Sequence, residues 1–332
     1  MKNVLLIGGA GYVGTIVSSY FLKLGYHVTI LDNFVYGNQN AISSFVGDPN
    51  YKVFLGDLGN NQDLAEASKG IKNIVILGGL VGDPITKSYP KESNLINDVG
   101  VKSCIDFFDD KDIERLILIS TCSNYGLIKE DELADEQFEL NPLSLYAKAK
   151  VSAELHMLSK KGHTRYSGTV LRFATAFGLA PRMRFDLSIS EFVKELYFGN
   201  ELLVFDEHTW RPYCHIRDFA RLIDIVLNAP KEAINYEIFN AGGEANNFTK
   251  KMIVEAIMKQ LPKAKIKYGE KGTDPRNYKV SFKKVSERLN FEPRFGVTEG
   301  IKELIDALEM GLFKDSITNK DQYGNYKINY TG

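Results

Sequence analysis

The chain has 332 residues, of which 44% are hydrophobic and 25% are charged, with a formal net charge of −1. This composition is typical of a globular protein with one large core and a smaller lobe. The near-zero charge argues against nucleic acid or an anionic membrane as a partner, so an anionic ligand would need a few local arginines.

Targeting and metal-site signals are absent from the sequence. The first apolar stretch, 4–7, is too short for a signal-peptide core, and no apolar run reaches the roughly eighteen residues of a membrane span. Three cysteines without metal-ligand spacing indicate neither a disulfide framework nor a zinc site, and His208 and His215 have no partner ligand at suitable spacing. We therefore expect a cytoplasmic protein without a metal centre.

Short aliphatic runs alternate with helix-length stretches along the first half of the chain. The expected strands are 2–7, 27–31, 51–55, 74–77, 116–120 and 169–173. Runs that are apolar on both faces predict parallel strands covered by helices on each side, and thus a doubly wound α/β sheet. Beyond residue 173 we expect helices at 192–198, 250–261 and 297–310, a strand at 202–205 and a late sheet strand at 236–240.

A glycine-rich turn follows the first expected strand. Gly8, Gly11 and Gly14 stand before a helical pattern, an arrangement in which a diphosphate meets a helix N-terminus. The second strand ends in Asp32, whose carboxylate would take the adenosine ribose hydroxyls and repel a 2′-phosphate. The sequence therefore predicts a Rossmann-type domain that binds NAD in preference to NADP.

The late strand implies that two lobes interleave along the chain. We expect a discontinuous NAD-binding Rossmann domain at 1–180 and 212–240. A smaller α/β substrate lobe would occupy 181–211 and 241–313, and the tail at 314–332 receives no assigned role.

A proton-transfer group is expected at the carboxyl end of the fifth strand, where open α/β sheets bind ligands. That strand delivers Thr121, and a later helix places Tyr146 and Lys150 one turn apart on one face. A neighbouring ammonium and an oxidised nicotinamide would both favour the phenolate of Tyr146, which could then take a hydroxyl proton. Thr121 would hydrogen-bond the same sugar oxygen.

These residues resemble the extended short-chain dehydrogenase/reductase family, in its nucleotide-sugar epimerase/dehydratase branch, over nearly the whole chain. The matching motifs are Gly8-x-x-Gly11-x-x-Gly14, Leu31-Asp32-Asn33, Gly56-Asp57-Leu58, Ser120-Thr121-Cys122-Ser123-Asn124-Tyr125-Gly126, Asn141-Pro142, Tyr146-x-x-x-Lys150, Leu171-Arg172-Phe173, Arg211-Pro212-Tyr213-Cys214-His215-Ile216-Arg217-Asp218, Asn240-Ala241-Gly242 and Asp274-Pro275-Arg276.

The resemblance implies roles for individual residues. The expected cofactor contacts are Gly8, Gly11, Tyr12, Val13, Gly14, Asp32, Asn33, Asp57, Leu58, Leu77, Gly78, Gly79, Asn97 and Phe173. The expected substrate contacts are Val81, Ser123, Thr175, Arg211 and Arg276, with the two arginines clamping a sugar diphosphate. The resemblance also implies a homodimer that pairs through the helix at 146–158 and the helix near 99–108.

Three departures from the family pattern narrow the expected reaction. Ile76-Leu77-Gly78-Gly79 replaces a His-x-Ala-Ala anchor, and Thr175 stands where 4-epimerases often have Asn. Cys122-Ser123 replaces the Asp-Glu pair of the 4,6-dehydratases, so the general acid for water elimination is missing.

We therefore expect NAD-dependent hydride transfer at C4 of a nucleoside-diphosphate sugar, by a 4-epimerase or a 4-dehydrogenase. Further motif likeness points to a bacterial subgroup that modifies deoxysugars and heptoses for surface polysaccharides and includes GDP-heptose C4 dehydrogenases. A 4-ketoreductase, a 4,6-dehydratase and a non-catalytic NAD-binding sensor remain as alternatives.

Overall fold

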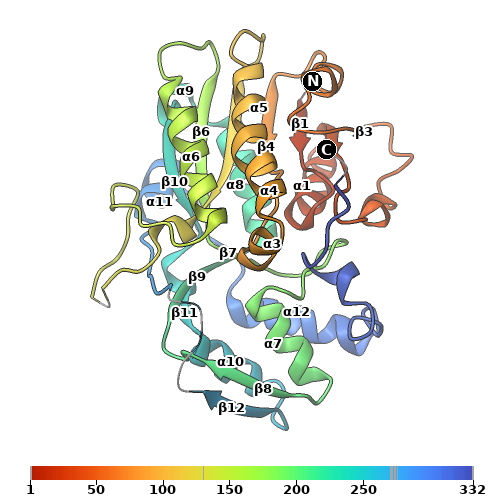
Figure 1. Cartoon of the computed structure of the whole chain (residues 1–332), viewed down its shortest axis with the longest axis vertical. Coiled ribbons are helices and arrows are strands. Elements are labelled where there is room, and N and C mark those ends of the chain that lie inside the picture. The colour runs from red at the N-terminus through yellow and green to blue at the C-terminus, as the bar shows by residue number, and fades with distance from the viewer. Residues whose placement is uncertain (1, 130, 270–271, 273, 275, 331–332) are drawn as a thin grey trace.

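The computed structural model describes residues 2–129, 131–269, 272, 274 and 276–330, so Pro275 of the Asp274-Pro275-Arg276 motif lies outside the described residues. A parallel sheet with helices on both faces forms the upper part of the molecule in Figure 1, and a smaller lobe lies below it. Within the described residues, no helix has both the length and the apolarity to cross a membrane.

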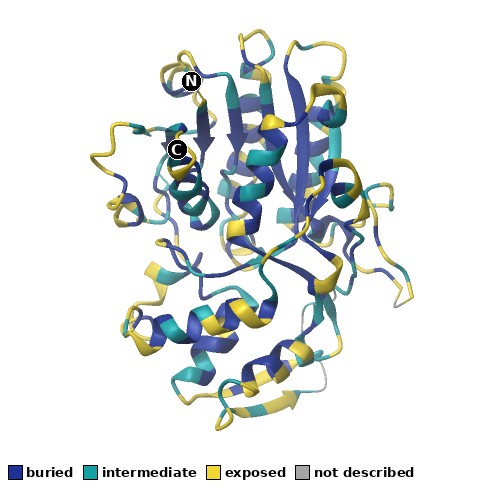
Figure 2. Ribbon diagram, turned by 180° about the vertical axis from the view of Figure 1, so that it is seen from behind, coloured by how far each residue is buried: buried dark blue, intermediate teal, exposed yellow. Residues whose placement is uncertain are grey.

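The main sheet has seven parallel strands in the order β10-β6-β5-β4-β1-β2-β3. Their bounds are β1 (Asn3–Ile7), β2 (His27–Asp32), β3 (Tyr51–Leu55), β4 (Asn73–Ile76), β5 (Arg115–Thr121), β6 (Ser167–Phe173) and β10 (Glu237–Ala241). The central strands are buried almost throughout, as their dark blue colour in Figure 2 shows, whereas β3 lies at an open edge. This arrangement confirms the expected doubly wound α/β class.

Alternating side chains of each strand feed two separate cores. On β1, Val4 and Leu6 join the core that contains Phe21, whereas Leu5 and Ile7 join the core that contains Met157. The first core lies under α1 (Tyr12–Lys23) and α8 (Ile216–Asn228), and the second under α2 (Asn61–Ala67), α5 (Val101–Phe107) and α6 (Leu145–Ser159). Because successive side chains in a strand point to opposite faces, a strand that is apolar throughout requires a helix layer on each side.

The chain between β4 and α5 is helical but irregular. It contains α3 (Asp83–Ser88), α4 (Pro90–Ser93) and a π-helical stretch, Asn94–Gly100, which continues into α5. This segment lies against α6, the helix that carries Tyr146.

The smaller lobe contains two short sheets and a group of helices. The strands are β7 (Thr175–Phe177), β8 (Glu201–Phe205), β9 (Trp210–His215), β11 (Asn247–Thr249) and β12 (Lys265–Gly269). The helices are α7 (Ser188–Tyr197), α10 (Lys250–Met258) and α12 (Val297–Glu309), with α9 (Lys231–Ile234) and α11 (Lys283–Leu289) beside the main sheet. Strands β11, β9 and β7 form one sheet, which contains residues from both sides of the domain boundaries that we expected near 180 and 211. The division of the chain into two domains stays a prediction.

The C-terminal tail is built into the fold. After a short 3₁₀ helix at Lys320–Tyr323, the dark blue end of the chain in Figure 1 runs up from the lobe toward β1, β2 and β3. Ile328 is buried in the core that also contains Leu31 and Val35. The sequence had given this segment no role.

Candidate active site

A cavity of about 470 Å³ opens at the carboxyl ends of the central strands, between the main sheet and the smaller lobe. This volume is in the range of small-molecule sites. Of the residues that the sequence singled out, those lining it are Gly8, Gly11, Tyr12, Val13, Gly14, Asp32, Asn33, Leu58, Leu77, Gly78, Gly79, Val81, Thr121, Ser123, Tyr146, Lys150, Phe173, Thr175, Arg211 and Arg276. Asp57 and Asn97, which the sequence also singled out, are not among the residues that line the cavity.

The glycine turn fits a diphosphate because of what its three glycines leave open. A Cβ on Gly8, whose φ is +82°, would lie 2.4 Å from the Cα of Gly78, and one on Gly14 would lie 2.5 Å from the carbonyl oxygen of Gly9. A Cβ on Gly11 would meet nothing closer than 3.5 Å, so that glycine keeps the cavity side of the turn clear. Gly11 caps α1 without a side-chain acceptor, which leaves first-turn amides available to an anion.

Asp32 connects the glycine turn to the loop after β2. One carboxylate oxygen accepts a hydrogen bond from the Ala10 amide at 2.9 Å, and the other accepts one from the Phe34 amide at 2.8 Å. Burial raises the pKa of Asp32, and these two hydrogen bonds oppose the rise. Asn33, the next residue, donates its side-chain amide to Asp57 at 2.9 Å. Asp57 thus contacts a residue of the cavity wall, and its own contact with the cofactor stays a prediction.

The loop after β4 is held from behind by Asn97. The Asn97 side chain accepts from the Leu80 amide at 2.7 Å and donates to the Leu80 carbonyl at 2.9 Å. A Cβ on Gly79, whose φ is +144°, would lie 2.7 Å from the Asn97 Oδ1. Asn97 is buried and is not among the residues that line the cavity, and its contact with the cofactor stays a prediction.

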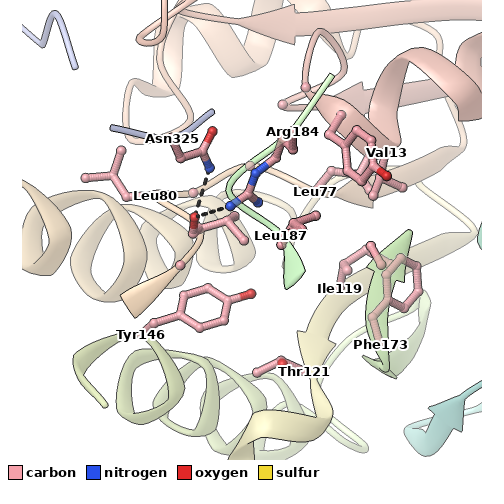
Figure 3. A pocket seen from close by; sticks show the side chains of 18 of the residues that line it. Val13, Leu77, Leu80, Ile119, Thr121, Tyr146, Phe173, Arg184, Leu187 and Asn325 are labelled. Atoms are coloured by element: carbon pink, nitrogen blue, oxygen red, sulfur yellow. Dashed lines mark hydrogen bonds between the residues drawn. The ribbon is translucent and has the colours of Figure 1, made fainter. Parts of the chain in front are cut away.

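The Thr121, Tyr146 and Lys150 side chains come together from two neighbouring elements. Thr121 ends β5, and α6 begins directly after its N-cap Ser144, whose hydroxyl accepts a hydrogen bond from the Ala147 amide at 3.2 Å. In Figure 3 the phenol of Tyr146 reaches into the cavity above Thr121, with Ile119, Phe173, Leu77 and Val13 along the other side. The Lys150 amine donates to the Ile119 carbonyl at 2.9 Å.

Burial is the largest influence on the pKa values of Tyr146 and Lys150. Burial raises the pKa of the Tyr146 phenol, and the Arg184 guanidinium is the strongest opposing charge. Burial lowers the pKa of the Lys150 amine to about 8. The Lys150 nitrogen lies 5.9 Å from the centre of the Tyr146 ring and is hydrogen-bonded to the Ile119 carbonyl. Burial therefore favours the protonated form of the phenol.

A buried ion pair, which the sequence reasoning missed, joins α6 to β5 and β6. The Glu154 carboxylate accepts from Arg172 Nη2 at 2.7 Å and from the Asn124 side-chain amide at 2.7 Å, and it also accepts from the Ser120 hydroxyl. Both members of the pair are almost completely buried. The available signal was an arginine between two large apolar residues, Leu171 and Phe173, in an expected buried strand, since such a residue needs a buried partner.

Arg211 and Arg276, the expected diphosphate contacts, share one carboxylate. Arg276 donates to both oxygens of Asp274, each at 2.8 Å, and forms an ion pair with Asp83 at 2.9 Å. Arg211 reaches Asp274 at 3.1 Å. Burial raises the pKa of Asp274, but hydrogen bonding and charge from the two arginines outweigh it and hold the pKa well below its usual value. The two guanidinium groups are thus gathered on one wall.

The rest of the cavity wall combines two predicted residues, Ser123 and Thr175, with residues that the sequence reasoning did not single out. Ser123 and Tyr278 place their hydroxyl oxygens 3.2 Å apart, and Thr175 begins β7 at the cavity wall. The further lining residues that we missed include Tyr36, Arg182, Arg184, Asp186 and Asn325. The two arginines and Asp186 are charged groups clustered directly after β7, a pattern that could have marked a polar wall.

Comparisons with known proteins agree with this geometry. The family model described as "NAD dependent epimerase/dehydratase family" matches residues 4–242. A UDP-glucuronate 4-epimerase of Thermodesulfobacterium geofontis is 28% identical over 92% of this chain and 96% of its own length. A UDP-glucose 4-epimerase of Corynebacterium glutamicum is 26% identical over 76% of this chain and 78% of its own.

A solved structure is similar over almost the whole chain. It is a dTDP-glucose 4,6-dehydratase of Bacillus anthracis in complex with NAD, with a TM-score of 0.83, 26% identity, and coverage of 97% of this chain and 100% of that one. Together with the family match over more than half of the sequence, this shows that the chain is an enzyme of the NAD dependent epimerase/dehydratase family.

Proposed function

We propose that this enzyme works at C4 of a nucleoside-diphosphate sugar, as a 4-epimerase or a 4-dehydrogenase. The observation that carries the proposal is that Thr121 and Tyr146 line the same cavity as the uncapped glycine turn and the paired Arg211 and Arg276. The 4-epimerase names of the two relatives given above support this reaction for a UDP-linked sugar.

The side chains of the cavity have distinct roles in this proposal. NAD, when bound, supplies the two-electron oxidation of a secondary alcohol. Thr121 hydrogen-bonds the reacting sugar oxygen, and Tyr146 exchanges the proton of that oxygen. Because burial favours the protonated phenol, positive charge near the phenol must promote the step in which Tyr146 accepts a proton. In this structure the Arg184 guanidinium is the charge that lowers the pKa of the phenol most, and the Lys150 amine lies 5.9 Å from the centre of its ring.

The nucleotide end of the substrate would lie against Arg211 and Arg276. Arginine forks match phosphate oxygens, and Asp274 holds the two guanidinium groups on one wall before any phosphate arrives. A diphosphate would share the donors that now face Asp274 and Asp83. Asp32 and the glycine turn would hold the adenosine and pyrophosphate of NAD.

The cavity offers little support for a 4,6-dehydratase. The Cys122 thiol is buried and directed toward the Arg172 carbonyl at 3.2 Å, and burial raises its pKa. Among the described carboxylates of the wall, Asp83, Asp186 and Asp274 form ion pairs with arginines. The other described carboxylates of the wall are Asp32, which accepts two backbone amides, and Glu191 on α7, whose pKa burial raises. Neither stands directly after Thr121, where the 4,6-dehydratases carry their Asp-Glu pair.

A 4-ketoreductase is the second candidate, because a protonated phenol can donate to a carbonyl oxygen. The finer expectation of a GDP-heptose substrate in surface-polysaccharide synthesis is carried by sequence motifs alone, and none of the three relatives described above is a heptose enzyme. UDP-hexoses and UDP-uronates are therefore our first candidates. We also keep a cytoplasmic homodimer as part of the proposal.

The test is a panel of UDP-, dTDP-, GDP- and CDP-sugars, including GDP-heptose, followed by nicotinamide absorbance and by the stereochemistry of the recovered sugar. We expect Tyr146→Phe to lower the rate by about 10²- to 10⁴-fold while NAD binding persists. Tyr268→Phe is the matched control, because Tyr268 is exposed on β12. A sensor would keep its function in Tyr146→Phe. Wild-type protein that binds NAD but neither oxidises, reduces nor epimerises any sugar would refute the proposal.

A further inference from the structure

The last described residues, 323–330, cross from the smaller lobe to the loops of the main sheet, and we call them the C-terminal strap. Apart from a hydrogen bond of the Tyr323 hydroxyl to Asp315 within the tail, its hydrogen bonds to the rest of the chain reach segments at or beside the cavity. The partners are Phe185 N to Tyr323 O at 2.7 Å, Arg182 Nη2 to Gly324 O at 3.0 Å, Asn325 Nδ2 to Val81 O at 2.8 Å, and Asn329 N to Val35 O at 2.8 Å.

The strap is anchored at both ends by packing. At its start, the rings of Phe185, Phe313 and Tyr323 pack together, with centroid separations of 5.3, 5.7 and 6.1 Å. Toward its end, Ile328 is buried in a core of the main sheet. Anchors on both sides keep the middle of the strap, including Asn325, at one place over the cavity.

Asn325 is the strap residue that enters the cavity wall. Its side chain is only 6% exposed and lines the cavity. In Figure 3, dashed lines from Asn325 and Arg184 meet at one oxygen beside Leu80, on the side of the cavity that faces the Tyr146 phenol. That oxygen is the carbonyl of Val81.

Of these two donors, Asn325 makes the better hydrogen bond. Arg184 reaches the Val81 carbonyl at 3.3 Å, and its Nε and Nη2 are already directed at the Asp186 carboxylate. Asn325 reaches the same carbonyl at 2.8 Å. Asn97 holds the adjacent Leu80 through two hydrogen bonds, so the loop at 80–82 is fixed by an asparagine of the π-helical stretch and by one of the strap.

We propose that the C-terminal strap forms part of the active site through Asn325. Asn325 is a positioning residue, which holds the loop at 80–82 in place as the cavity wall that contacts the substrate sugar. This inference rests on the proposed function, because it assigns the wall beside Tyr146 to the sugar. The strap thus supplies Asn325 to the cavity wall, although this residue lies 244 positions after Val81 in the sequence.

The test compares Asn325→Ala with Asn319→Ala, an exposed asparagine of the same tail that lies outside the strap. With a nucleotide sugar that the wild type turns over, Asn325→Ala should raise KM and lower kcat by about ten-fold combined. Thermal unfolding would show whether the variant is folded. Asn319→Ala should stay within two-fold of wild type. Asn325→Ser, which keeps a short donor, should recover part of the loss.

A second readout does not depend on turnover. Hydrogen–deuterium exchange at 80–86 should quicken by about five-fold in Asn325→Ala, as the loss of one net hydrogen bond implies, and should not change in Asn319→Ala. Unchanged exchange at 80–86, or wild-type kcat and KM in folded Asn325→Ala, would overturn the inference. If the wild type turned over no sugar, the proposed function would fail, whereas the exchange result would still decide whether Asn325 positions the loop.

Discussion

Replacing Glu154 by glutamine tests how far the site depends on the buried network behind it. Glu154 lies one turn after Lys150 on α6, and its carboxylate receives hydrogen bonds from Arg172, Asn124 and Ser120. Glutamine keeps the shape of the side chain but removes its charge, so the Arg172 guanidinium would stay buried without a counter-charge.

The expected cost follows from the burial of the pair. The side chains of Arg172 and Glu154 are 3% and 2% exposed, so solvent screens neither charge. Removing one member of such a pair costs about 3–5 kcal/mol because the other charge is left uncompensated. Domains are stable by only about 5–15 kcal/mol, so Glu154→Gln should lose a large share of the folding free energy.

Urea unfolding at neutral pH, followed by circular dichroism, measures this cost. The double variant Glu154→Gln with Arg172→Met should be more stable than Glu154→Gln alone, because the orphaned charge is gone. A loss below about 1 kcal/mol in the single variant would refute the argument, since it would mean that Arg172 finds water or another partner.

Four further outcomes follow from the geometry. Gly14→Ala should unfold at a lower temperature because its Cβ would meet the Gly9 carbonyl at 2.5 Å, whereas Gly11→Ala should keep its stability and lose NAD affinity, measured by calorimetry. Because burial lowers the pKa of Lys150 to about 8, the folded state binds fewer protons than the unfolded state from about pH 8 to the ordinary lysine pKa. The unfolding free energy of wild type relative to Lys150→Met should therefore rise with pH over that window, and a flat difference would contradict the burial argument. Asp186→Asn should leave Arg184 uncompensated and shift kcat/KM several-fold toward a uronate over the neutral sugar with the same nucleotide, and an unchanged ratio would place the sugar elsewhere. Leu155 is 63% exposed on α6, the helix through which we expect the dimer to form, so Leu155→Glu should sediment as a monomer where the wild type sediments as a dimer. A dimeric variant would show that this face of α6 is not the interface.

Local sequence patterns were sufficient for the main sheet and for the glycine turn. Uninterrupted apolar strands require cover on both faces, and a glycine series between a strand and a helix has few other uses, so both could be predicted without coordinates. The placement of Tyr146 and Lys150 one turn apart on α6 follows from helical periodicity alone. The strands β7, β9 and β11 were not predicted, because β7 and β11 have only three residues each and β9 contains a proline and several polar residues.

Tertiary structure alone decided how charged groups pair and which distant segments meet. Asp57 and Asn97 contact residues of the cavity wall without lining the cavity, and Lys150 donates to a backbone carbonyl, because strand pairing and helix packing set those distances. The pKa of Tyr146 depends on its burial, which the chemistry of neighbouring residues in the sequence does not reveal. Asn325 reaches Val81 across 244 positions of sequence. A contact between residues so far apart in sequence has no local pattern, because it forms only when the C-terminal strap and the loop after β4 lie side by side.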